Sequence, residues 1–307
     1  MLEYVAKRLL LTIPTVVTIT LVVFLMLHAV PGDPAIIFAG DKNVTPEQLA
    51  VVRLEMGLDR PIMVQYIDYL SRILVLNLGR SLYSRIPVTH EIGNRVSSSA
   101  ELAVAAFALA SVLGILLGVV SALWRSSWVD VAAMSFAIVG VSMPIFWLAS
   151  MLIFVFAIML GWFPVTGAGG LNRLVLPALA LGMISSATLA RLVRSSVLEI
   201  LSQPYVTTAR SKGLREMVIL TRHVLKNAFI PVITVMGLQF GTLLSGAVIT
   251  ETVFARPGLG KLLVDAILIK DFPVIQAVIL IVSLIYVLMN LLVDVSYAFL
   301  DPRIRFD

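Results

Sequence analysis

The sequence predicts an all-α membrane protein with six transmembrane helices and both termini in the cytoplasm. Hydrophobic residues make up 59% of the 307 residues and charged residues only 13%, whereas an average soluble domain has roughly 45–50% apolar and about 25% charged residues. A soluble protein of this composition would expose large apolar patches to water. The excess of apolar side chains therefore predicts a surface that faces lipid.

Six uncharged stretches are long enough to cross a bilayer, which takes roughly 17–25 apolar residues. They are residues 9–30, 102–124, 131–160, 174–190, 228–250 and 272–293. The third uncharged run continues to Asn172, but the glycines and Pro164 after residue 160 are expected to end its helix, and Pro144 is expected to kink it. The first stretch exceeds the roughly 7–15 apolar residues of a signal peptide, so a retained helix is expected.

Basic residues gather on one side of these six helices. An even number of crossings puts both termini on the same side, and short segments rich in Lys and Arg face the cytoplasm. The segments that share a side with the termini carry Lys7, Arg8, Arg125, Arg191, Arg194, Arg210, Lys212, Arg215, Arg222, Lys226, Arg303 and Arg305. The opposite segment, residues 31–100, also carries arginines, but acidic residues balance them and the segment is too long for this rule to apply. That side is therefore predicted to be cytoplasmic.

The segment between the first two crossings, residues 31–98, is predicted to form a small helical cap outside the cytoplasm. Thr45 and Gln48 have the spacing of a capping box, with Pro46 at the first helical position. Gly57 is placed to end that helix in the left-handed conformation. Apolar residues recur at helical spacing over residues 62–76, which predicts a second amphipathic helix.

The segment between the fourth and fifth crossings, residues 191–227, is predicted to form a short helix tethered to the membrane at both ends. Residues 197–201 continue the fourth helix, and Pro204 should interrupt it. Residues 205–212 then form a short helix that Gly213 can terminate, and a further helix over residues 214–227 leads back to the membrane. An element held in this way can transmit force.

This segment contains two motifs, YVTTARSKG at 205–213 and RHVLKNA at 222–228. With these motifs the chain resembles the inner-membrane permeases of ABC importers for dipeptides, oligopeptides, glutathione and nickel. Further matches are PGDP at 31–34, GLDRP at 57–61, GRS at 79–81, RPGLG at 256–260, DFPVIQ at 271–276 and LDPRIR at 300–305. The chain departs from the general ABC importer loop at Thr207, Thr208, His223 and Lys226, but these residues are similar to the first-permease branch of the peptide family.

The resemblance implies a type I ABC importer permease fold in which residues 1–307 form a single transmembrane permease domain. Residues 31–98 would be an extracytoplasmic helical insertion, and residues 191–227 a cytoplasmic coupling loop that docks on an ATPase. The residues implied in ATPase coupling are Tyr205, Thr208, Ala209, Arg210, Lys212, Gly213, Leu214, Arg222 and His223.

The resemblance also implies partners in the bacterial inner membrane. They are a second homologous permease subunit, two ABC ATPase subunits that bind ATP and Mg, a periplasmic or lipid-anchored solute-binding protein, and membrane lipid. The chain would supply the pathway by alternating access. Dipeptides, oligopeptides, glutathione and nickel chelates all remain open as cargo.

The chain itself shows no pattern for catalysis, cofactor binding or metal binding. It has no cysteine, and the Gly258, Gly260 and Lys261 group lacks the first glycine and the final Ser or Thr of a phosphate-binding loop. We therefore expect no enzyme activity in this chain, with ATP hydrolysis in separate subunits. Nucleic-acid binding is not expected, because both ends of the 191–227 segment are tied to the bilayer. A stand-alone channel and a structural membrane subunit remain as alternatives.

Overall fold

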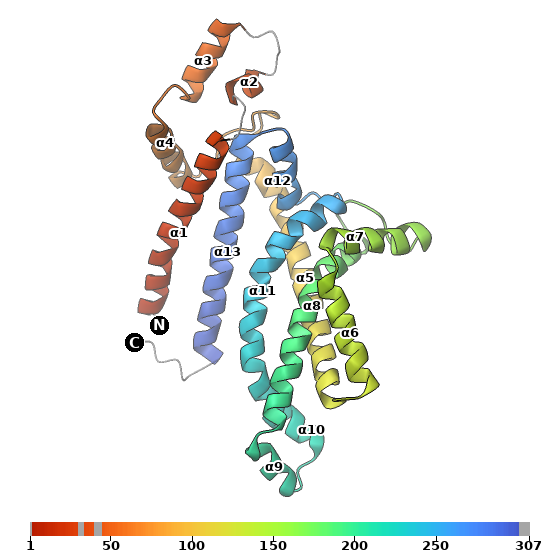
Figure 1. Cartoon of the computed structure of the whole chain (residues 1–307). Coiled ribbons are helices and arrows are strands. Elements are labelled where there is room, and N and C mark those ends of the chain that lie inside the picture. Colours follow the sequence, from red (N-terminus) through yellow and green to blue (C-terminus); the bar gives the residue numbers. More distant parts are fainter. Residues whose placement is uncertain (1, 30–33, 40–44, 301–307) are drawn as a thin grey trace. The chain divides into compact units, whose positions relative to one another are not determined.

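The computed structural model describes residues 2–29, 34–39 and 45–300, and the regular elements in these ranges are helices (Figure 1). Among the described residues the only extended pairing is an isolated bridge between Arg80 and Pro87. The helices in chain order are α1 (Leu2–Ala29), α2 (Pro34–Ala39), α3 (Pro46–Met56), α4 (Ile62–Leu74), α5 (Val88–Leu123), α6 (Trp128–Ser142), α7 (Ile145–Leu152), η1 (Ile153–Met159), α8 (Asn172–Leu201), α9 (Pro204–Ser211), α10 (Glu216–Val218), η2 (Ile219–Leu225), α11 (Lys226–Val253), α12 (Leu259–Leu268) and α13 (Phe272–Leu300).

Four of the described helical segments are long and apolar enough to cross a membrane. They are Val88–Leu123, Asn172–Leu201, Glu216–Val253 and Phe272–Leu292, and a bent pair raises the number to five if it counts as one span. The first predicted crossing appears as a shorter apolar stretch, Leu10–Met26, within α1. Four of the six predicted stretches therefore correspond to candidate spans among the described residues, the stretch 131–160 corresponds to the bent pair, and the stretch 9–30 corresponds to this shorter helix.

The predicted third helix, residues 131–160, is not continuous. It is split at Met143 and Pro144 into α6 and an α7–η1 segment that meet at 109°, as Figure 1 shows. Proline removes a backbone N–H and disfavours helical geometry in the residue before it, and Met143 is accordingly extended. The expected kink is thus a complete break.

The chain divides into two compact units, of which the first comprises Ala100–Arg256 and the chain from Leu288 onward. Glycines let its helices approach closely. A Cβ atom on Gly114 would lie 2.7 Å from the Leu189 side chain, and one on Gly118 would lie 2.6 Å from the Ala190 carbonyl oxygen. This Gly-x-x-x-Gly pair of α5 therefore packs closely against α8.

The second unit comprises Leu2–Ser99 and Pro257–Val287, and its α3 begins and ends as predicted. Thr45 accepts a hydrogen bond from the Gln48 amide, and the Gln48 side chain accepts one from the Thr45 amide, which completes the capping box. Gly57 ends the helix in the left-handed conformation at φ +69°. Pro31 to Asp33, which belong to one of the motifs quoted above, lie outside the described residues, as does most of the 300–305 tail.

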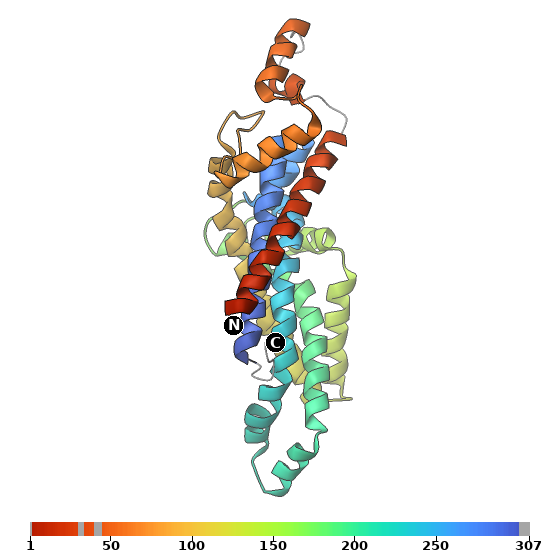
Figure 2. The ribbon, with the colours of Figure 1, turned by 90° about the vertical axis from the view of Figure 1, so that its left-hand side faces the viewer.

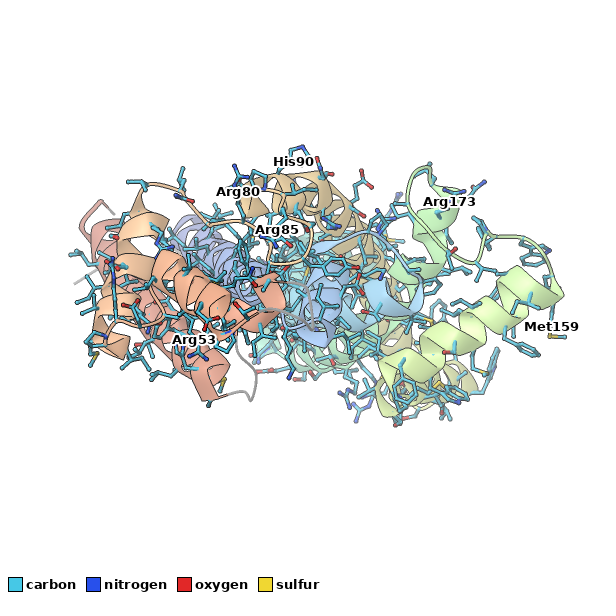
Figure 3. All side chains as sticks on the ribbon, turned by 90° about the horizontal axis from the view of Figure 1, so that it is seen from above. Arg53, Arg80, Arg85, His90, Met159 and Arg173 are labelled. Atoms are coloured by element: carbon cyan, nitrogen blue, oxygen red, sulfur yellow. The ribbon has the colours of Figure 1, made fainter. Side chains whose placement is uncertain are left out.

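Two of those motifs meet in the second unit. The Ser81 hydroxyl donates to the carboxylate of Asp271, which also accepts from the Leu82 amide at 3.1 Å. Asp271 immediately precedes α13, so the 79–82 turn is fixed to the start of that helix. A nearby loop residue, Arg85, holds α2 in place, because its guanidinium carbon lies 3.7 Å from the Phe38 ring centroid. Arg80, Arg85 and His90 are labelled in Figure 3.

Candidate coupling site and outer cavity

The segment predicted to couple to an ATPase forms a compact helical tip on the first unit. Figures 1 and 2 show α9 and α10 beyond the adjoining ends of α8 and α11. Helix α8 continues to Leu201, and α9 starts with Pro204 at the first helical position. Proline suits this position because the first N–H groups of a helix have no partner within the helix. The predicted interruption and short helix are both present.

Gly213 ends α9 as predicted. It adopts φ +74°, its amide donates to the Arg210 carbonyl at 2.9 Å, and the Leu214 amide donates to the Ala209 carbonyl at 3.3 Å. These two bonds form a Schellman motif, which satisfies carbonyl groups that the helix leaves without partners. The turn direction after α9 therefore depends on a left-handed residue at position 213.

One side of α9 is buried and the other is open. Val206 and Ala209, three residues apart, pack against Ile219 and Val224 of η2. Ala209 therefore contributes packing. The other residues named for ATPase coupling lie at this tip, and all are exposed except His223, which is half-buried: Tyr205, Thr208, Arg210, Lys212, Gly213, Leu214, Arg222 and His223.

Polar bonds fix the tip internally. The Tyr205 hydroxyl accepts from the Asn227 amide group at 3.0 Å and donates to the His223 carbonyl at 3.5 Å. Arg210 makes two hydrogen bonds to Glu216, at 2.8 and 3.3 Å, which join α9 to α10. Both ends of α9 are thus linked to the segment that leads into α11.

An ion pair between a buried carboxylate and a partly exposed guanidinium lies near the base of this tip. The Arg194 guanidinium on α8 donates to both carboxylate oxygens of Asp130, each at 2.8 Å. Asp130 lies in the first turn of α6 and also accepts from the Ser121 hydroxyl and the Ser126 amide. Both carboxylate oxygens of Asp130 therefore have hydrogen-bond partners, and the carboxylate connects α8 to α5 and α6.

Sequence reasoning missed several residues of this region. The sequence pattern predicts only a topology signal at Arg194, and Asp130 directly precedes the third apolar stretch. Glu216, Met217 and Asn227 were not named as site residues. One signal is present in the sequence: Asp130 is the only acid between Trp124 and the long uncharged run that starts at Val131.

The second unit contains a separate cavity of about 720 Å³ between α3, α4 and the adjoining ends of α1 and α13. Its walls carry both charge signs and aromatic rings, from Arg53 (labelled in Figure 3), Arg60, Arg72, Asp59, Asp68, Phe24 and Tyr69. Arg60 and Asp68 pair at 2.7 Å, and burial raises the pKa of Tyr69 to about 12, with Tyr66 adding to the rise.

Long apolar helical spans with a short helix tethered between two of them define a polytopic membrane protein. The family model described as "Binding-protein-dependent transport system inner membrane component" matches residues 114–306, and the model for its N-terminal part matches residues 1–96. The chain belongs to this family, the permease subunits of ABC importers. It is a multi-pass protein of the bacterial inner membrane and supplies the transmembrane pathway of an importer.

Individual relatives agree with this assignment. The glutathione transport system permease proteins GsiC of Salmonella typhi and of Escherichia coli strain K12 are each 44% identical over 306 residues, covering 100% of both chains. Among solved structures, the inward-facing MetNI methionine ABC transporter matches with a TM-score of 0.61 and 17% identity, over 70% of this chain and 98% of that chain. An amino acid ABC transporter matches with a TM-score of 0.56 and 15% identity, over 69% and 94%. At these identities, the structural matches concern the fold.

Proposed function

We propose that this permease imports glutathione or a closely related short peptide. The observation that carries the proposal is the 44% identity to glutathione permeases, which extends over the whole chain. The outer cavity supports it in a general way, because glutathione, like other peptides, carries both carboxylate and ammonium groups. Dipeptides, longer peptides and nickel chelates are the competing cargoes.

The working importer would contain several subunits. In this proposal the chain crosses the membrane six times with both termini in the cytoplasm, and it lines the pathway together with a second, similar permease. Two ATPase subunits bind ATP and Mg, and a solute-binding protein docks on the extracytoplasmic segment 31–98. The shorter apolar stretch Leu10–Met26 would be the first of the six crossings, surrounded by lipid.

Coupling would pass through α9. ATP-driven closure of the ATPase pair moves this helix, and α8 and α11 follow because they flank it in the chain. The bonds of Tyr205 to Asn227 at the start of α11 and of Arg210 to Glu216 of α10 support this proposal, since they make the tip move as one body. The Asp130–Arg194 pair would carry the movement on to α5 and α6.

Two measurements test the proposal at different levels. Thermal stabilisation of the cognate solute-binding protein across glutathione, dipeptides, oligopeptides and a nickel chelate identifies the cargo, and glutathione should give the largest shift. A larger shift with the nickel chelate would overturn the glutathione assignment alone. ATP-dependent uptake into proteoliposomes that contain all subunits tests the importer mechanism, and equal flux through the purified chain without ATP would indicate a stand-alone channel.

A further inference from the structure

Helix α4 has an apolar side that the described residues of the chain leave uncovered. Met63, Ile67 and Leu74 are 69%, 63% and 84% exposed. Their spacing of four and seven residues puts them on one face of the helix. The apolar surface continues through Val75 and Leu76, which are also exposed. Apolar patches of this kind mark a surface that meets something other than water.

The polar side of the same helix is bound to the protein. The Gln65 side-chain amide donates a hydrogen bond to the Arg60 carbonyl at 2.8 Å, and its Oε1 lies 3.2 Å from Nε2 of His28. Asp68 forms the ion pair with Arg60. The orientation of α4 about its own axis is therefore fixed, and the apolar side faces away from the rest of the second unit.

Helix α4 also lies at the level of apolar residues in α1. Tyr66 is buried, and its hydroxyl donates to the Val17 carbonyl at 3.0 Å and lies 3.0 Å from the Thr20 hydroxyl. Both α1 residues are inside the apolar stretch Leu10–Met26. The Tyr69 ring stacks with Phe24 at 6.1 Å between centroids. Figures 1 and 2 show α4 beside the end of α1 that leads to Ala29.

We infer that α4 is an interfacial helix whose Met63, Ile67 and Leu74 face enters the lipid of the membrane surface next to α1. A helix with one apolar face and one polar face binds in the plane of that boundary, with the apolar face among the upper acyl chains. Lipid is the occupant because the buried side of α4 packs on the apolar stretch of α1, which itself leaves Leu25 and Met26 exposed, in a protein of the inner membrane. The cap would then rest on the bilayer through α4.

Because the chain has no cysteine, single labelled positions test this inference. Ile67→Cys and Leu74→Cys variants, each carrying an environment-sensitive fluorophore, are reconstituted with the complete importer in liposomes. Lipids brominated on the acyl chains and aqueous iodide serve as the two quenchers. We expect bromine to quench the labels at 67 and 74 several-fold more than iodide does. The cysteine-free parent complex gives the background labelling of the partner subunits.

Glu47→Cys, in the first turn of α3 and fully exposed, is the matched control and should show the opposite order of quenching. Iodide quenching at 67 and 74 equal to that at 47 would overturn the inference. So would protection from both quenchers, which would mean that a protein covers the face. If that protection required the solute-binding protein, the covering chain would be that partner.

Discussion

The two arms of the Arg194 guanidinium hold the two carboxylate oxygens of Asp130, each at 2.8 Å. The pair joins α8, which leads to the coupling tip, to the first turn of α6. Ser121 of α5 donates to the same carboxylate. A displacement of α8 at this level would therefore act on three helices at once.

Removing the arginine should destabilise the protein. In an Arg194→Ala variant, Asp130 stays buried without its cation, a change that typically costs about 3–5 kcal/mol for a fully buried pair. Because Arg194 is partly exposed, we expect about 2–3 kcal/mol here. A lower midpoint of thermal unfolding for the solubilised complex would report the loss. Arg191→Ala, one turn earlier and exposed, is the control and should leave the midpoint nearly unchanged; equal losses would contradict the role of the pair.

Gly213 should be required for coupling rather than for insertion. A valine at φ +74° is strained by about 1–2 kcal/mol, although no neighbouring atom lies within 4 Å of the added Cβ. We expect Gly213→Val to reduce uptake into proteoliposomes while ATP hydrolysis continues. Gly213→Asn should retain most of the uptake, since asparagine tolerates the left-handed region. Normal uptake by the valine variant would remove Gly213 from the coupling mechanism.

Arg210 should bind the ATPase as well as forming its ion pair with Glu216. Arg210→Glu is expected to reduce co-purification of the ATPase subunits, because it reverses a charge on the exposed side of α9. A double variant, Arg210→Glu with Glu216→Arg, restores the local pair with its charges exchanged. We expect co-purification to remain low in the double variant. Recovery there would show that Arg210 acts only by holding α9 to α10.

Met217 should form part of the apolar contact with the ATPase. It is 69% exposed at the tip, close in sequence to the exposed Leu214, and exposed apolar side chains are common anchors at interfaces. Met217→Ser is expected to lower the fraction of ATPase retained during purification. Met159→Ser is matched in chemistry and exposure, at 66%, but lies on η1 (Figure 3). A similar loss from both variants would point to general instability.

Gly118 should not accept even a methyl group. A Cβ at this position would lie 2.6 Å from the Ala190 carbonyl oxygen, which is backbone and cannot rotate away. Gly118→Ala should therefore cost about 1–3 kcal/mol through forced separation of α5 and α8. Gly93→Ala is the control on the same helix, because no atom lies within 4 Å of its added Cβ, and it should be neutral or slightly stabilising. Thermal unfolding of the solubilised complex measures both.

Much of the local structure follows from the sequence, because it depends on neighbouring residues. The capping box at Thr45 and the glycine ends at Gly57 and Gly213 are set by side-chain chemistry and by the tolerance of glycine for positive φ. The length of the apolar stretches likewise indicated where the long helices lie. The α9 helix was predictable for the same reason, since Pro204 and Gly213 mark its two ends.

Other features depend on contacts that the sequence does not display. The chain also adopts positive φ after helix ends at Leu76, Ala255 and Lys270. None of these residue types favours that conformation, so the sequence does not predict it. The pairing of Asp130 with Arg194 spans 64 positions. The full break at Pro144 exceeds what one proline in a helix usually causes, so packing of α7 against α8 and α11 must contribute.

The break at Pro144 leaves α6 with only 15 residues, a length of about 22 Å at 1.5 Å per residue. The hydrocarbon interior of a bilayer is roughly 30 Å thick, while α5 and α8 are each long enough to traverse it. A short rod packed beside long ones produces hydrophobic mismatch, which the lipid relieves by thinning locally. The bilayer would therefore be thinner next to α6. The acyl-chain length of the host membrane would then influence how readily the importer changes conformation.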